Sequence, residues 1–192
     1  MYKVILFCLL SAFSFTSCDL FDTREAEKPS TSRENFPPAT SPDVLLTNFI
    51  KSYKVKDDNA YAGCFYDVSN SALKYSFSPA SGARESYPVF ADIWGLDQEV
   101  RFFRNLISKV PEGSSINLTF SDSNSVNYGD SVIFTARYSV SVPEQSQTVS
   151  FVGQLELKLI VDDRLLWKIY TWLDIRNSTF LTWSDMKGYY YF

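Results

Sequence analysis

The fold is decided by the stretch SVIFTARYSVSVPEQSQTVSFVGQLELKLIV, residues 131–161. Apolar residues alternate with mostly polar ones from Val132 to Val142, and again from Val149 to Val161. A period of two is typical of a strand with one buried face. A short polar segment, residues 143–146, lies between the two runs, so we predict that they pair antiparallel as a hairpin.

The same alternation continues on both sides of this hairpin. It is present in residues 116–120, and again in residues 165–173 beyond the polar turn 162–164. We therefore predict an antiparallel sheet of about four strands. The carboxylates of Glu156 and Asp174 fall in the polar sets of their strands, so we expect both on the solvated face.

Helical patterns fill the first half of the domain. Ser41 can cap a helix, Pro42 suits its first turn, and apolar residues then recur at helical spacing as far as Tyr53. A short second helix is expected to carry Tyr61, Cys64 and Phe65. A third is expected from about Asp97 to Lys109, with a buried face of Val100, Phe103, Ile107 and Val110.

The connection between the second and third helices, residues 75–94, is rich in aromatic residues. Pro79 and Pro88 interrupt it, so we expect it to be irregular. Helices first and antiparallel strands after them predict an α+β fold, with the helices packed on one face of the sheet.

Two short motifs resemble the nuclear transport factor two-like superfamily, which includes SnoaL-like and cystatin-like domains. One is YKVKDDNAY, residues 53–61, and the other is WKIYTW, residues 167–172. The resemblance covers about residues 42–175. It implies a cone in which the helices pack against a strongly bent sheet.

The resemblance also implies where catalysis would take place. Enzymes of this superfamily, among them dehydratases and isomerases, usually place an acid, often with a histidine, in the apolar pocket of the cone. This chain has no histidine, which excludes Ser-His-Asp and Cys-His catalysis as well as histidine zinc sites. Because the strand carboxylates fall in polar sets, we assign no catalytic residue, and we expect neither a metal nor a cofactor.

The N-terminus resembles a bacterial lipoprotein signal. Lys3 precedes an apolar run from Val4 to Phe15, and Thr16 and Ser17 lead to Cys18. The run is too short to span a bilayer, which needs about 20 residues. The resemblance implies cleavage before Cys18 and lipidation of its thiol, which would anchor the chain in the inner or outer membrane. The alternative is an ordinary secretory signal with an incidental cysteine.

These features divide the chain into a signal peptide (residues 1–17), a lipidated cysteine with a flexible tether (18–40) and one domain (41–192). Loss of residues 1–17 removes one charged side chain, Lys3, so the net charge of −4 becomes −5. An acidic chain lacks the basic footprint that nucleic acid requires. Apart from Cys18, the mature chain retains only Cys64, which excludes an internal disulfide and which we expect to be buried.

The aromatic residues suggest two further sites. A pocket for a small apolar ligand would be lined by Tyr75, Phe77, Tyr87, Phe90 and Trp94, unless these side chains simply fill the core. We expect the C-terminal tail to pack on the outer face of the sheet. An uncovered aromatic patch there would instead mark a surface for a protein partner, formed by Tyr170, Trp172 and Trp183.

The sequence therefore predicts a lipid-anchored, non-enzymatic protein of the bacterial cell envelope that binds a small apolar ligand or an envelope protein. One alternative is a histidine-free enzyme of the dehydratase or isomerase type, acting through a buried carboxylate or tyrosine. The other is a structural assembly factor of the envelope.

Overall fold

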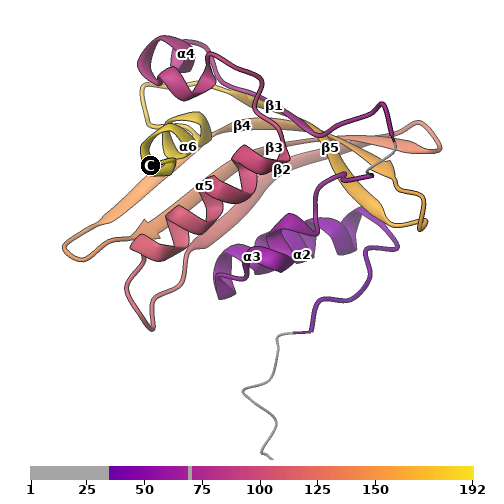
Figure 1. The fold of residues 1–192 in the computed structure, drawn as a ribbon, viewed down its shortest axis with the longest axis horizontal. Coiled ribbons are helices and arrows are strands. Elements are labelled where there is room, and N and C mark those ends of the chain that lie inside the picture. Colours follow the sequence, from indigo (N-terminus) through magenta and orange to yellow (C-terminus); the bar gives the residue numbers. More distant parts are fainter. Residues whose placement is uncertain (1–34, 69–70) are drawn as a thin grey trace, which may run out of the picture. The chain divides into compact units, whose positions relative to one another are not determined.

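The computed structural model describes residues 35–68 and 71–192. The expected signal peptide, Cys18 and most of the expected tether lie outside these residues. The elements in chain order are α2 (Pro42–Val55), α3 (Asp58–Ala62), β1 (Ser76–Ser78), α4 (Ala83–Ser86), the 3-10 helix η1 (Pro88–Phe90), α5 (Leu96–Lys109), β2 (Asn117–Asn127), β3 (Ser131–Pro143), β4 (Thr148–Val161), β5 (Trp167–Ile175) and α6 (Trp183–Tyr190). The fold is α+β, as predicted (Figure 1).

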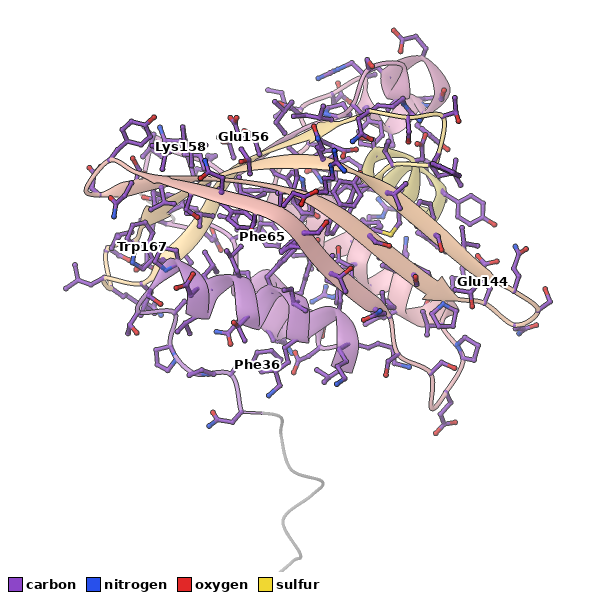
Figure 2. The ribbon with its side chains drawn as sticks, turned by 180° about the vertical axis from the view of Figure 1, so that it is seen from behind. Phe36, Phe65, Glu144, Glu156, Lys158 and Trp167 are labelled. Atoms are coloured by element: carbon purple, nitrogen blue, oxygen red, sulfur yellow. The ribbon has the colours of Figure 1, made fainter. Side chains whose placement is uncertain are left out.

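The sheet has five strands in the order β1-β5-β4-β3-β2. The four long strands pair antiparallel, and the predicted hairpin places Val140 opposite Phe151. The fifth strand was not predicted: β1 arises within the stretch expected to be irregular and pairs parallel with β5, Phe77 opposite Trp172. The sheet is therefore mixed, with a short parallel edge strand. Figure 2 shows its outer face, which carries Glu156 and Lys158.

The two long predicted helices are confirmed. The Ser41 hydroxyl accepts a hydrogen bond from the Val44 N–H (3.3 Å), which starts α2. The buried stripe of α5 differs from the expected one: Val100 and Ile107 are only half-buried. Phe103 and Val110 are buried as expected, and Glu99, Phe102 and Leu106 are buried as well. In the described part of the chain, no helix is long and apolar enough to cross a membrane.

A register shift changes the inner face of β5. Leu159 pairs with Ile169 but Lys158 pairs with Thr171, which leaves Tyr170 as an extra residue. Because side chains alternate along a strand, one extra residue reverses the faces beyond it. Asp174 is therefore buried, and the expectation that it lies on the solvated face is wrong. Leu173, expected inside, is 40% exposed.

The C-terminal tail forms α6 on the same face of the sheet as the other helices, not on the outer face as predicted (Figure 1). The ring of Trp183 lies 4.5 Å from the ring of Trp172 and 4.8 Å from that of Tyr138, measured between centroids. Gly188 allows α6 to approach closely, because a Cβ there would collide with the Tyr87 ring. The helix thus completes the core.

Candidate functional site

A carboxylate and an ammonium meet inside the cone. Glu99 comes from α5 and Lys187 from α6, and both side chains are 0% exposed. Lys187 Nζ lies 2.6 Å from Glu99 Oε2. A buried charge is costly unless it is paired and hydrogen-bonded. The pair is therefore a central element of the domain, and the sequence did not predict it.

Three neutral donors complete the surroundings of the Glu99 carboxylate. The Tyr61 hydroxyl donates to Oε1 at 2.5 Å, the Tyr75 hydroxyl donates to Oε2 at 2.7 Å, and Trp94 Nε1 donates to Oε2 at 2.8 Å. Burial, and then the negative charge of Glu99, raise the pKa of Tyr61 and Tyr75 well above the usual value. Both tyrosines therefore stay neutral donors at physiological pH. Together with Trp94 and Lys187, they give the carboxylate four partners.

Aromatic rings surround the Lys187 ammonium. Nζ lies 3.6 Å from the ring centroid of Phe77 and 3.9 Å from that of Trp172, with Trp94 and Phe102 at 5.5 and 5.8 Å. A cation over a ring face is stabilised more strongly when water is absent. Burial still lowers the pKa of Lys187 to about 8, although the nearby Glu99 charge opposes this shift.

A second buried carboxylate holds the start of α6. Asp174 Oδ1 accepts from the Tyr138 hydroxyl at 2.6 Å, and Oδ2 accepts from the N–H and the hydroxyl of Ser184 at 2.7 and 2.5 Å. Burial raises the pKa of Asp174, while the bonds from Ser184 and Tyr138 oppose the rise. A carboxylate at the first turn of a helix also interacts favourably with the helix dipole.

The predicted pocket residues fill the core. Tyr75, Phe77, Phe90 and Trp94 are at most 4% exposed, and three of them contact the Glu99–Lys187 pair directly. Tyr87 is only half-buried and lies against α6. Three residues were expected to form a partner surface. Trp172 and Trp183 are buried, and of the three only Tyr170 reaches the surface, where its ring contacts that of Tyr66.

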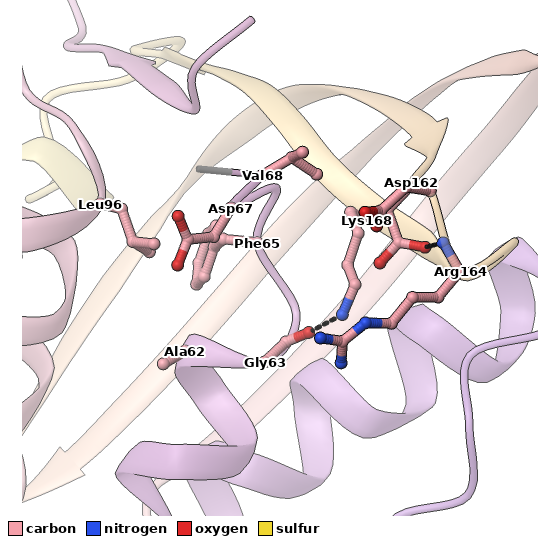
Figure 3. Close-up of a pocket in the computed structure, with 10 residues that line it drawn as sticks. Ala62, Gly63, Phe65, Asp67, Val68, Leu96, Asp162, Arg164 and Lys168 are labelled. Carbon is pink, nitrogen blue, oxygen red and sulfur yellow. Dashed lines mark hydrogen bonds between the residues drawn. The ribbon is translucent and has the colours of Figure 1, made fainter. Parts of the chain in front are cut away.

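The surface has two recesses of interest. One, of about 270 Å³, is largely apolar and lies beside α6; it is lined by Tyr87, Gln147, Val149, Phe151, Leu181, Asp185 and Tyr189. The other, of about 540 Å³, is a charged cleft between the end of α3 and the β4–β5 turn (Figure 3). In this cleft, Lys168 Nζ donates to the Gly63 carbonyl at 2.5 Å. The Asp162 carboxylate accepts from the N–H of Arg164 at 2.9 Å.

The remaining site predictions concern metals and the free thiol. Among the described residues, no group of three or more histidines, cysteines, aspartates or glutamates is placed to hold a metal ion. Cys64 is a free thiol that is 2% exposed, and burial raises its pKa to about 12. It is buried, as predicted, and it is a poor nucleophile at neutral pH.

Comparisons with known proteins give the fold a name. No protein-family model matches the sequence, and no curated protein is significantly similar to it. Among solved structures, the chain is similar to a candidate dehydratase of the nuclear transport factor two-like family from Streptomyces avermitilis (TM-score 0.56, 11% identity, 71% of this chain and 94% of the other). It is also similar to a candidate aromatic ring hydroxylase from Novosphingobium aromaticivorans (0.56, 14%, 76% and 92%).

A third similar structure is a nuclear transport factor two-like superfamily protein from Salmonella enterica serovar Typhimurium (TM-score 0.53, 14% identity, 70% of this chain and 88% of the other). Identities this low describe the fold and leave the activity open. The helices on one face of a curled five-stranded sheet are common to this architecture. The chain therefore has the α+β cone fold of nuclear transport factor two-like domains.

Proposed function

We propose that this chain is a lipid-anchored, non-enzymatic protein of the bacterial cell envelope, whose domain binds a small apolar ligand at its surface. One observation supports the proposal that the domain is not an enzyme. The place where an enzyme of this fold would hold its acid and substrate contains Glu99 and Lys187, both 0% exposed and joined at 2.6 Å. A substrate cannot reach the carboxylate while α6 is in place, so binding takes place outside the cone.

The apolar recess beside α6 is the ligand site that we propose. Its volume of about 270 Å³ suits a small aromatic molecule of up to three rings. Tyr87, Val149 and Phe151 supply apolar walls, and Leu181 (46% exposed) and Tyr189 (62% exposed) form its rim. Pockets of this kind bind by burial of apolar surface, with a few polar groups for orientation.

Binding at the recess can be tested with phenylnaphthylamine, an apolar fluorophore whose emission rises when it is buried. We expect saturable binding to the mature chain, residues 18–192. Leu181→Glu should weaken it at least about tenfold, because a charge at the rim opposes the burial of an apolar ring. The matched control is Leu173→Glu, a leucine of similar exposure on the outer face, which should bind like wild type. Equal binding by all three proteins would contradict the site.

The lipid anchor can be tested in cells with a palmitate analogue. We expect the full-length chain to incorporate the label and to sediment with membranes, since two acyl chains anchor a protein stably. Cys18→Ala should lose both properties, whereas Cys8→Ala, within the signal, should keep them. A Cys18→Ala chain that remains acylated and membrane-bound would overturn the anchor, and a soluble, unlabelled wild type would favour an ordinary secretory signal.

The enzyme alternative has one observation in its favour. Glu99 is a buried carboxylate with the hydroxyls of Tyr61 and Tyr75 bonded to it, and two similar structures carry the names of candidate enzymes. Catalysis would require Lys187 to leave the carboxylate. A crystal structure with a small molecule lodged against Glu99 would favour this alternative. For a structural assembly factor, the expected exposed patch is reduced to Tyr170, since Trp172 and Trp183 are buried.

A further inference from the structure

One carboxylate lies in the wall of the apolar recess beside α6. Asp185 stands in the first turn of α6, and its side chain is only 8% exposed. Of the seven residues that line the recess, it is the only one that carries a charge. A few polar groups in an otherwise apolar pocket decide how a ligand is oriented and which ligands are accepted. The selectivity of the recess therefore depends on what Asp185 can still bind.

The two oxygens of the Asp185 carboxylate have different surroundings. Oδ2 accepts from the N–H and the hydroxyl of Thr182 at 2.7 and 3.0 Å, and from the guanidinium of Arg176 at 2.7 Å. Within residues 35–68 and 71–192, no donor is bonded to Oδ1. Oδ2 thus holds the start of α6, whereas Oδ1 keeps its capacity to accept a hydrogen bond.

The unpartnered oxygen, Oδ1, is open to the recess. In the described part of the chain, two side-chain polar atoms are both sealed from solvent and without a partner, Asn48 Oδ1 and Trp172 Nε1. Asp185 Oδ1 is not one of them, so it keeps some contact with solvent although its residue is only 6% exposed. Since Asp185 lines the recess, this is the opening that the oxygen faces. A ligand that fills the recess therefore replaces the water at Oδ1.

The surroundings of Asp185 favour a neutral ligand over a cationic one. Its charge already has a counter-charge, because Arg176 lies 2.7 Å from Oδ2. The neighbouring walls of the recess, Val149 and Phe151, are apolar and would remove the hydration of a cation without replacing it. A neutral N–H or O–H group needs only the one acceptor that Oδ1 offers.

We propose that the recess selects neutral apolar molecules that carry an N–H or O–H donor, such as aromatic amines and phenols, and that Asp185 Oδ1 accepts this hydrogen bond. The proposal rests on the ligand site proposed above and adds the chemical class of the ligand. A hydrogen bond to a charged acceptor contributes more than one between neutral groups. A ligand of the same shape without a donor would lose this bond and would also bury Oδ1 without a partner, so it should bind more weakly.

The test compares three probes of nearly the same shape. Phenylnaphthylamine carries an N–H between its ring systems, benzylnaphthalene has a CH₂ there, and phenyl naphthyl ether has an oxygen that can only accept. The affinity of the amine for residues 18–192 is measured by fluorescence, and those of the other two by competition with it. We expect the amine to bind at least about tenfold more tightly than either analogue, because only the amine can donate to Oδ1.

Asp185→Asn is expected to remove this preference. Thr182 and Arg176 both donate at the Oδ2 position, so the amide oxygen should occupy it and the amide NH₂ should face the recess. The amine should then bind about tenfold more weakly, while the ether should bind at least as tightly as to wild type. The matched control is Asp57→Asn, whose carboxylate starts α3 by accepting from the Ala60 N–H and lines no part of the recess. It should bind all three probes like wild type.

The outcomes distinguish the selectivity from the site itself. Equal affinities of the three probes for wild type, all weakened by Leu181→Glu, would overturn the role of Asp185 and leave the recess as the ligand site. An Asp185→Asn protein that keeps the wild-type preference for the amine would overturn it as well. If Leu181→Glu bound the amine as tightly as wild type, the recess itself would be the wrong site. Should Asp185→Asn fail to fold, the comparison of the three probes on wild type still decides.

Discussion

Lys187→Ala is expected to destabilise the domain by about 3–5 kcal/mol, because it leaves the Glu99 carboxylate buried without its counter-charge. It also leaves a cavity among Phe77 and Trp172, whose rings now lie within 4 Å of the ammonium. Urea unfolding followed by tryptophan fluorescence measures the loss. The matched control is Lys109→Ala, an exposed lysine at the end of α5, which should change stability by less than about 0.5 kcal/mol.

A double replacement distinguishes the loss of stability caused by an unpaired charge from the loss caused by poorer packing. In Glu99→Gln/Lys187→Met both charges are absent and the volumes are similar, so most of the lost stability should return. The amide oxygen of the glutamine can still accept from the tyrosines. If Lys187→Ala proved as harmless as Lys109→Ala, or if the double variant were as unstable as the single one, the pair would not have the structural role argued for it.

The stability difference between wild type and Lys187→Met is expected to depend on pH. Burial lowers the pKa of Lys187 from 10.5 to about 8 in the folded state. Between these values the unfolded chain binds the proton and the folded chain does not, so stability rises with pH. From pH 8 to pH 10 the difference should shift by about 2 kcal/mol in favour of wild type. Well below pH 8, Lys187 is protonated in both the folded and the unfolded chain, so its contribution to the stability difference stays constant.

Other buried groups lower the stability of the folded domain as pH rises. Burial raises the pKa of Cys64 from 9.0 to about 12 and raises that of Tyr53, Tyr61 and Tyr75 well above 10.0. These groups ionise first in the unfolded chain, so each lowers stability as pH rises through its unfolded value. The cysteine and the tyrosines are present in wild type and in Lys187→Met, so their contributions cancel in the stability difference between the two proteins. A difference that stays constant from pH 8 to pH 10 would contradict a lowered pKa for Lys187.

The sheet and the long helices could be predicted because their patterns are local. The alternation from Val132 to Val161 specifies two strands and their hairpin with no knowledge of the rest of the chain. The exchange of faces in β5 could not be read in the same way, since the extra residue Tyr170 is defined only by its pairing with β4. Asp174 was assigned to the wrong face for this reason alone.

The buried pair was missed because each partner looks ordinary in its own segment. Glu99 stands three and four residues before Phe102 and Phe103, so it lies on the apolar side of the helix, but the predicted buried face did not include it. Lys187 lies within an aromatic tail that was expected on the outer face. Only the contact between α5 and α6, eighty-eight residues apart at this pair, reveals that each charge has a partner.

The contact between Glu99 and Lys187 joins residues that are 88 positions apart in the chain. Closing a loop of this length costs conformational entropy before the contact stabilises anything, and contacts of this kind slow folding. Until α6 has docked, the Glu99 carboxylate has no counter-charge and Trp172 is not packed against Trp183. We therefore expect α6 to dock in the same cooperative step that closes the core.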